Sequence, residues 1–164
     1  MQFLLALLGF IVFTRGKCLS NNWITDTSSL GLPIIKDNYV QLGDITMDNV
    51  VNATTSVHQD FDFVDCKSRL TFEFSGSTKD NSQNNDFQAV CIKDALTDKT
   101  LVPLFKTLYG FNMVNDPIWI FQTYNLCDLG LHSKIGTRIR IQFLVQGNGN
   151  NRGTTMFIRN VCLQ

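Results

Sequence analysis

The stretch Arg138–Val145 reads Arg-Ile-Arg-Ile-Gln-Phe-Leu-Val and alternates polar with apolar side chains over its first six residues. Successive side chains of a β-strand point to opposite faces of a sheet, so this alternation predicts a strand with one buried face and one solvated face. The expected inward residues are Ile139, Ile141, Phe143 and Val145, and the expected outward residues are Arg138, Arg140 and Gln142.

Further strands are predicted outward from this stretch, since short runs rich in β-branched and aromatic residues recur along the chain and no window has a sustained helical repeat. The polar runs Ser75–Asp86 and Gly147–Gly153 predict loops, because Gly, Asn, Asp and Ser favour turns. Leu70–Lys93 and Arg138–Leu163 are therefore expected to be two hairpins. The pattern predicts an all-β fold, an antiparallel β-sandwich of the jelly-roll type. The expected strands are Tyr39–Ile45, Leu70–Phe74, Phe87–Lys93, Ile118–Tyr124, Arg138–Val145 and Thr154–Leu163.

The first residues predict a secretory signal peptide over 1–16. Phe3–Phe13 is an apolar run of eleven residues, too short to span a bilayer and typical of a signal core. The remainder, 17–164, is expected to form one domain of a secreted protein. Its first part, 17–37, is expected to be an extended lead-in that packs Trp23, or Ile34 and Ile35, on the sandwich.

The charge balance excludes several classes of partner. The chain has 14 basic and 14 acidic residues, and loss of Arg15 with the signal peptide leaves the remainder near neutral. No basic run indicates nucleic acid, and no later apolar run is long enough to span a membrane. Asn52-Ala53-Thr54 is an N-glycosylation sequon, which predicts a glycan on Asn52 at the surface.

Part of the chain is similar to MAM domains. The segment Cys66–Ser77 resembles the strand of that family that opens with a cysteine and ends near a glycine. Phe87–Lys93 resembles its next strand, and Trp119 stands where such domains often carry a tryptophan. Arg138–Gly153 followed by the strand Thr155–Leu163 is similar to the family's ending. Taken over Cys66–Leu163, the resemblance implies an extracellular recognition or adhesion module without catalysis.

Two features depart from the MAM pattern. Ile158-Arg159-Asn160-Val161 occupies the place of an acidic pair that is usual in the final strand. The early cysteine pair is also missing, because only Cys18 precedes Cys66.

Five cysteines fit an oxidising compartment, and none forms a Cys-x-x-Cys pair. Four of them, Cys66, Cys91, Cys127 and Cys162, allow three pairings that the sequence alone does not separate. The MAM resemblance implies Cys66–Cys162, which leaves Cys91–Cys127. The expected hairpin also places Cys91 opposite about Arg69 rather than Cys66. Cys18 then stays free, pairs between chains, or is removed if signal cleavage falls later.

Asp60 and Asp62 form the most suggestive acidic pair. Alternation with Phe61 and Phe63 puts both carboxylates on one face, which makes them weak candidates for Ca²⁺ ligands. The favoured interpretation is a charged, solvent-facing strand that discourages edge pairing, with no metal and no cofactor.

The sequence gives little support to catalysis. His58 and His132 are far apart, and no serine lies in a Gly-x-Ser-x-Gly motif. Glu73 is the only glutamate, and no second carboxylate, such as Asp94, is singled out as its partner for glycoside hydrolysis. We therefore expect no catalytic residues.

The preferred functional hypothesis is a secreted module that recognises a protein partner. The alternative is a jelly-roll lectin, in which Trp119 would supply an aromatic platform and Asn148, Asn150 and Asn151 the polar contacts. A third hypothesis is a matrix or coat component in which Cys18 links chains.

Overall fold

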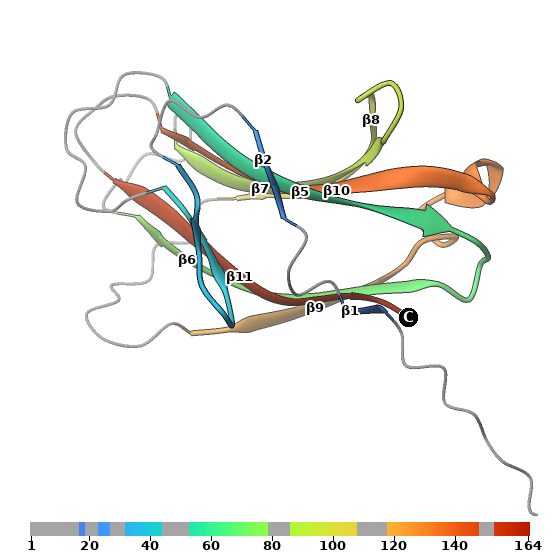
Figure 1. Cartoon of the computed structure of the whole chain (residues 1–164), viewed down its shortest axis with the longest axis horizontal. Helices are drawn as coiled ribbons and strands as arrows, with labels where there is room; N and C mark the ends of the chain where they lie inside the picture. Colours follow the sequence, from blue (N-terminus) through green and yellow to red (C-terminus); the bar gives the residue numbers. More distant parts are fainter. Residues whose placement is uncertain are drawn as a thin grey trace, which may run out of the picture.

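The computed structural model describes residues 17–18, 23–26, 32–43, 53–78, 86–107, 118–147 and 153–164. Their strands form two antiparallel sheets that face each other, which confirms the predicted β-sandwich (Figure 1). Sheet A has the order β3 (Ile34–Ile35), β4 (Val40–Leu42), β11 (Thr154–Leu163), β6 (Arg69–Thr78) and β9 (Ile120–Asn125), with β1 (Lys17–Cys18) also paired to β11. Sheet B has the order β2 (Ile24–Thr25), β5 (Ala53–Phe63), β10 (Thr137–Gly147), β7 (Phe87–Asp94) and β8 (Thr100–Thr107). A short 3₁₀ helix, Leu131–Lys134, precedes β10.

The core lies between the sheets and follows the alternation read from the sequence. The inward residues of β10, Ile139, Ile141, Phe143 and Val145, are fully buried, as are Leu70, Phe72 and Phe74 of β6. The Phe72 and Phe143 rings meet edge to face across the core, with 5.2 Å between their centroids. Burying each such side chain contributes about 1.5–3 kcal/mol, so the facing apolar rows account for the two-layer arrangement.

Both predicted hairpins are wrong. β6 belongs to sheet A and β7 to sheet B, and likewise β11 belongs to sheet A and β10 to sheet B. Alternation shows which side chains face the core, but it does not show which strand pairs with which. The predicted loop Ser75–Asp86 also begins too early, because β6 continues to Thr78 and pairs there with β11.

The expected strands did not include two of the long ones, β5 and β8. Only the end of β5, near Asp60–Phe63, shows clean alternation; earlier in the strand, polar Thr55 and Gln59 are buried, which obscures the pattern. β8 contains Pro103, and its pairing with β7 shifts register twice.

Where the structure describes it, the lead-in 17–37 contributes three two-residue strands, β1 and β3 to sheet A and β2 to sheet B. Trp23 packs edge to face on Phe143, with 5.8 Å between ring centroids, as expected for this residue. Ile34 and Ile35 remain 44% and 48% exposed, so they do not pack on the sandwich. The predicted signal peptide and Asn52 lie outside the described residues. Among the residues described, there is no helix of the length and hydropathy needed to cross a membrane.

The predicted disulfides are wrong in their pairing. Cys18 bonds to Cys162, Cys66 bonds to Cys127, and Cys91 is a free thiol. Cys18 and Cys162 lie directly opposite each other on β1 and β11, with Cα atoms 3.9 Å apart. Cys66 precedes β6 and Cys127 follows β9, and these two strands are neighbours in sheet A. The bond within the chain also removes Cys18 as a link between chains.

Candidate functional site

A hollow lies along one edge of β11, in the gap between β4 and β1. β4 pairs with Met156–Ile158 and β1 pairs with Cys162 and Leu163. Residues 159–161 therefore pair with neither strand on that edge. The interruption leaves a cavity of about 390 Å³, within the ~300–1,000 Å³ typical of small-molecule sites.

The strand bulges at this gap. The register between β11 and β6 shifts between Arg159 and Cys162, and Asn160 adopts a positive φ of 53°. Asparagine tolerates this left-handed conformation better than most residues, which explains its place in the bulge. β-bulges reorient side chains and are frequent near binding sites.

Two aromatic side chains, Trp23 and Tyr39, line the hollow. The Trp23 ring packs edge to face on Phe143, and the Tyr39 ring packs edge to face on Phe157. The ring centroids are 5.8 Å apart in each pair. The turn between β3 and β4 completes the rim, because Lys36 N–H donates to the Tyr39 carbonyl over 2.9 Å. The polar lining residues are Lys36, Asp37, Asn38, Arg159 and Asn160.

Glu73 of β6 fixes the two polar side chains of the bulge. Arg159 Nε and Nη2 contact Glu73 Oε2 at 2.8 and 2.6 Å, and Asn160 Nδ2 donates to Glu73 Oε1 over 2.9 Å. The hydrogen bond from Asn160, together with that from Arg159 and its charge, holds the pKa of Glu73 below its ordinary value. Glu73 is therefore ionised at neutral pH, and the bulge presents Arg159 and Asn160 in one fixed geometry.

The hollow carries almost no net charge. Glu73 neutralises Arg159, and Lys36 and Asp37 carry opposite charges on the rim. A site of this kind combines apolar ring faces with amide, carboxylate and ammonium groups that both donate and accept hydrogen bonds. It suits an uncharged ligand with many hydroxyl groups.

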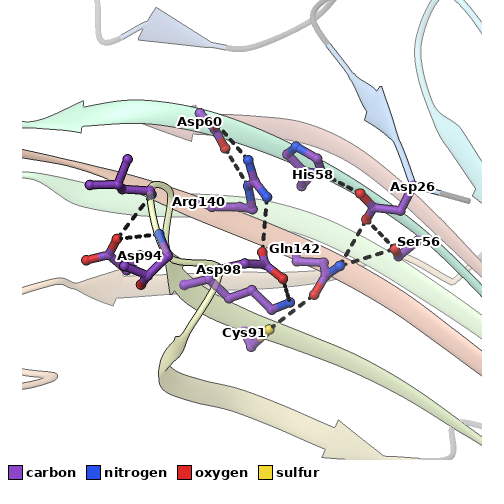
Figure 2. A network of polar contacts seen from close by, with 12 residues as sticks. Asp26, Ser56, His58, Asp60, Cys91, Asp94, Asp98, Arg140 and Gln142 are labelled. Atoms are coloured by element: carbon purple, nitrogen blue, oxygen red, sulfur yellow. Dashed lines mark hydrogen bonds and ion pairs between the residues drawn. The ribbon is translucent and has the colours of Figure 1, made fainter.

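A second polar cluster lies on the outer face of sheet B (Figure 2). Asp26, just after β2, has Ser56, His58 and Gln142 around its carboxylate. Ser56 Oγ and Gln142 Nε2 donate to Asp26 Oδ2, the latter over 2.9 Å, and His58 Nδ1 lies 3.0 Å from Oδ1. Burial raises the pKa of Asp26, but the hydrogen bonds from Ser56 and Gln142 and the nearby His58 outweigh it and leave the pKa lowered. This cluster fastens the lead-in to sheet B.

On the same face, Asp60 is paired with a cation. Its two carboxylate oxygens accept from Arg140 Nε and Nη2, at 2.8 and 3.1 Å. Asp62 is exposed on the same face of β5, as alternation predicted. Arg140 Nη1 also donates to Asp98, and Lys93 Nζ lies 3.0 Å from the same carboxylate. Charges of opposite sign therefore alternate across the strands of this face (Figure 2).

The histidines and carboxylates weighed for catalysis in the sequence have other partners in the fold. His58 Nδ1 lies 3.0 Å from Asp26 Oδ1, and the other oxygen of that carboxylate accepts from Ser56 Oγ. Glu73 and Asp94 lie in different sheets, and each carboxylate is bound to a cation, Arg159 and Lys134 respectively. His132 lies near the Cys66 and Cys127 sulfur atoms, but those two atoms are joined to each other.

Of the residues predicted to bind a ligand, Trp119 lies beside the site. Its ring centroid is 4.0 Å from Arg159 Cζ, so the indole covers the guanidinium that Glu73 holds. Asn148, Asn150 and Asn151 lie outside the described residues.

Sequence reasoning missed Tyr39, Arg159 and Asn160 as site residues. Their positions around one hollow depend on where β1 and β4 pair along β11, which local patterns in the sequence do not show.

Comparison with known proteins leaves the family unassigned. No family model matches the chain, and no curated protein matches it, so neither supports the MAM resemblance. Solved structures with a similar fold include TmCBM61 in complex with β-1,4-galactotriose, at 14% identity and a TM-score of 0.45 over 88% of this chain and 89% of that one. Others are the N-terminal cellulose-binding domain of Cellulomonas fimi β-1,4-glucanase C and CBM28, described as specific for non-crystalline cellulose. Each has 10% identity and a TM-score of 0.47, over 87% of both chains. The chain's own strand pairing makes it an antiparallel β-sandwich, and these likenesses do not place it in a family.

Proposed function

We propose that the chain binds carbohydrate in the hollow beside the β11 bulge. The observation that carries the proposal is the joint presence of Trp23 and Tyr39 with the fixed pair Arg159 and Asn160 around one cavity. A sugar ring has an apolar face, which packs on an aromatic side chain, and hydroxyl groups that pair with amide and guanidinium groups.

The charge of the hollow narrows the ligand class. Since Arg159 is neutralised by Glu73, the site has no unpaired cluster of one sign that would select a phosphate or a polyacid. A neutral glycan fits this balance. The two disulfides support an extracellular location, because such bonds persist in oxidising compartments.

A glycan array probed with the purified protein tests the proposal. We expect defined glycans to bind the wild type and to bind Tyr39→Ala at least tenfold more weakly, because the variant lacks one aromatic wall. Leu96→Ala is the matched control, since Leu96 is 93% exposed in the turn between β7 and β8, away from the hollow. An array with no binding, or equal binding by the Tyr39 variant, would contradict the proposal.

Protein recognition remains a second candidate, favoured by one observation. β3 forms the edge of sheet A and exposes Ile34 and Ile35 by nearly half, next to Leu32 at 78%. Exposed sheet edges pair readily with an extended partner segment. This candidate would be favoured if no glycan on the array binds, and if the wild type captures a defined extracellular protein that Ile34→Lys does not capture.

A further inference from the structure

The hollow continues onto the outer face of sheet A through Arg159. This residue lines the hollow, and its guanidinium also packs on the Trp119 ring, with Cζ 4.0 Å from the ring centroid. One face of the indole is therefore taken by Arg159. Trp119 is half-buried, so part of its indole remains accessible to solvent.

The strand register extends this surface away from the hollow. Arg159 pairs with Glu73 on β6, and Glu73 pairs with Phe121 on β9. Neighbouring strands lie about 4.8 Å apart, so Phe121 stands roughly 10 Å from Arg159 across the sheet. Thr71 and Thr123 form the adjacent pair on the same face, which places two hydroxyl groups beside the aromatic rings.

Phe121 has no role in the core. It is 61% exposed, whereas Phe72 and Phe74 on the neighbouring strand are fully buried. A large aromatic side chain left in water beside a second, half-buried one is a common feature of recognition surfaces.

We propose that Trp119 and Phe121 form an outer strip that binds further sugar units of the same ligand, so that the ligand is a glycan chain and not a single sugar. This inference rests on the proposed function, because the strip is an extension of the hollow. The hollow takes one end of the chain beside Tyr39. The strip then stacks later rings on Trp119 and Phe121, while the threonine hydroxyls pair with sugar hydroxyls.

Isothermal titration tests the length of the ligand. The probes are the tightest-binding glycan of the array and its fragments of one, two, three and four sugar units. We expect wild-type affinity to rise about tenfold or more between the shortest and the longest fragment. Trp119→Ala should lose most of that rise.

Phe121→Ala provides a second variant that leaves Arg159 and its contacts in place. It should reduce the gain from chain length without changing the affinity for the single sugar, and circular dichroism should show both variants folded. Equal wild-type affinity for all fragments would overturn the outer strip while leaving the hollow as the binding site. A single-sugar affinity that falls in Phe121→Ala would also overturn it, and an array with no binding would instead refute the proposed function itself.

Discussion

At the scale of single residues, Glu73 organises the candidate site. It is the only glutamate of the chain, and its two oxygens hold Arg159 and Asn160 in the bulge. Asn160 has a left-handed backbone, a conformation that costs free energy for residues other than glycine. The hydrogen bond from its side chain to Glu73 offsets part of that cost.

Replacing Glu73 by glutamine should destabilise the protein by about 1 kcal/mol at neutral pH and lower the Tm by roughly 3 °C, since one charge-assisted contact is lost. The pKa of Glu73 is lowered in the fold, so its stabilising effect is present above the ordinary value of 4.5 and disappears as the pH falls through the lowered pKa. The Tm difference between wild type and E73Q should therefore shrink in acid. Thermal unfolding at pH 7, 5, 4 and 3 measures it, and a constant difference would show that Glu73 is not the titrating group.

Gly76 leaves room for the side chain of Gln88, which packs closely against its backbone. A Cβ at this position would lie 2.6 Å from the Gln88 amide, whose Nε2 donates to the Thr155 carbonyl over 3.0 Å. Gly76→Ala should cost about 1–3 kcal/mol in the free energy of unfolding. In a Gln88→Ala background the same change should cost much less. Denaturant unfolding of the wild type, the two single variants and the double variant measures this coupling. If Gly76→Ala costs the same free energy of unfolding in both backgrounds, the coupling is disproved.

At the scale of elements, β2 is a short strand held by side chains more than by its ladder. It pairs with β5 at only two positions, Ile24 with His58 and Thr25 with Val57. The cluster around Asp26 adds the contacts that hold it, and Trp23, just before β2, reaches the hollow. The Asp26 cluster on the outer face of sheet B thus holds in place the segment that brings Trp23 to the hollow.

Asp26→Ala should release β2 and let water reach Trp23. In a Trp119→Phe background, where Trp23 is the single tryptophan, its emission should shift to longer wavelength, and exchange of the Ile24 and Thr25 amides should accelerate. Asp98→Ala is the control, because the ion pairs of Asp98 on the same face go to Lys93 of β7 and Arg140 of β10. Unchanged emission in the Asp26 variant would show that β2 is held by other contacts.

The elements also show how far sequence reasoning reaches. The strand predicted at Thr154–Leu163 coincides with β11, and Arg138–Val145 lies within β10, because both stretches are rich in apolar and β-branched residues and the polar run Gly147–Gly153 separates them in the sequence. β5 was missed where Thr55 and Gln59 occupy inward positions. Trp119 was selected by its residue type and by its place in the MAM resemblance, whereas the hollow depends on where β1 and β4 stop along β11. The hollow therefore depends on how segments far apart in the sequence pair with one another, and the local periodicity of the sequence does not predict such pairing.

At the scale of the whole molecule, two disulfides close long loops. Cys18–Cys162 spans 144 residues and Cys66–Cys127 spans 61. In the chain-entropy model such loops stabilise the fold by about 5 and 4 kcal/mol, respectively. Both bonds act on sheet A, so the sheet that carries the hollow is also the cross-linked one.

Peptide mapping under non-reducing conditions should find these two bonds and a single thiol per chain. Burial raises the pKa of the Cys91 thiol, so iodoacetamide should modify it slowly in the native protein and fully after unfolding. Cys91→Ser should leave the Tm almost unchanged, whereas the Cys18→Ser, Cys162→Ser double variant should lower it by 10 °C or more. A mapped bond that includes Cys91 would contradict the structure.

The antiparallel pairing of β1 with β11 has a practical consequence for engineering. Lys17 and Leu163 are register partners, so the chain enters and leaves this part of the fold at neighbouring points, and Cys18 and Cys162 border the hollow. A reporter domain fused at either point would stand beside the hollow. A circular permutant that joins these points by a short linker and opens the backbone at exposed Leu96, in the turn between β7 and β8 of the opposite sheet, would free the approach.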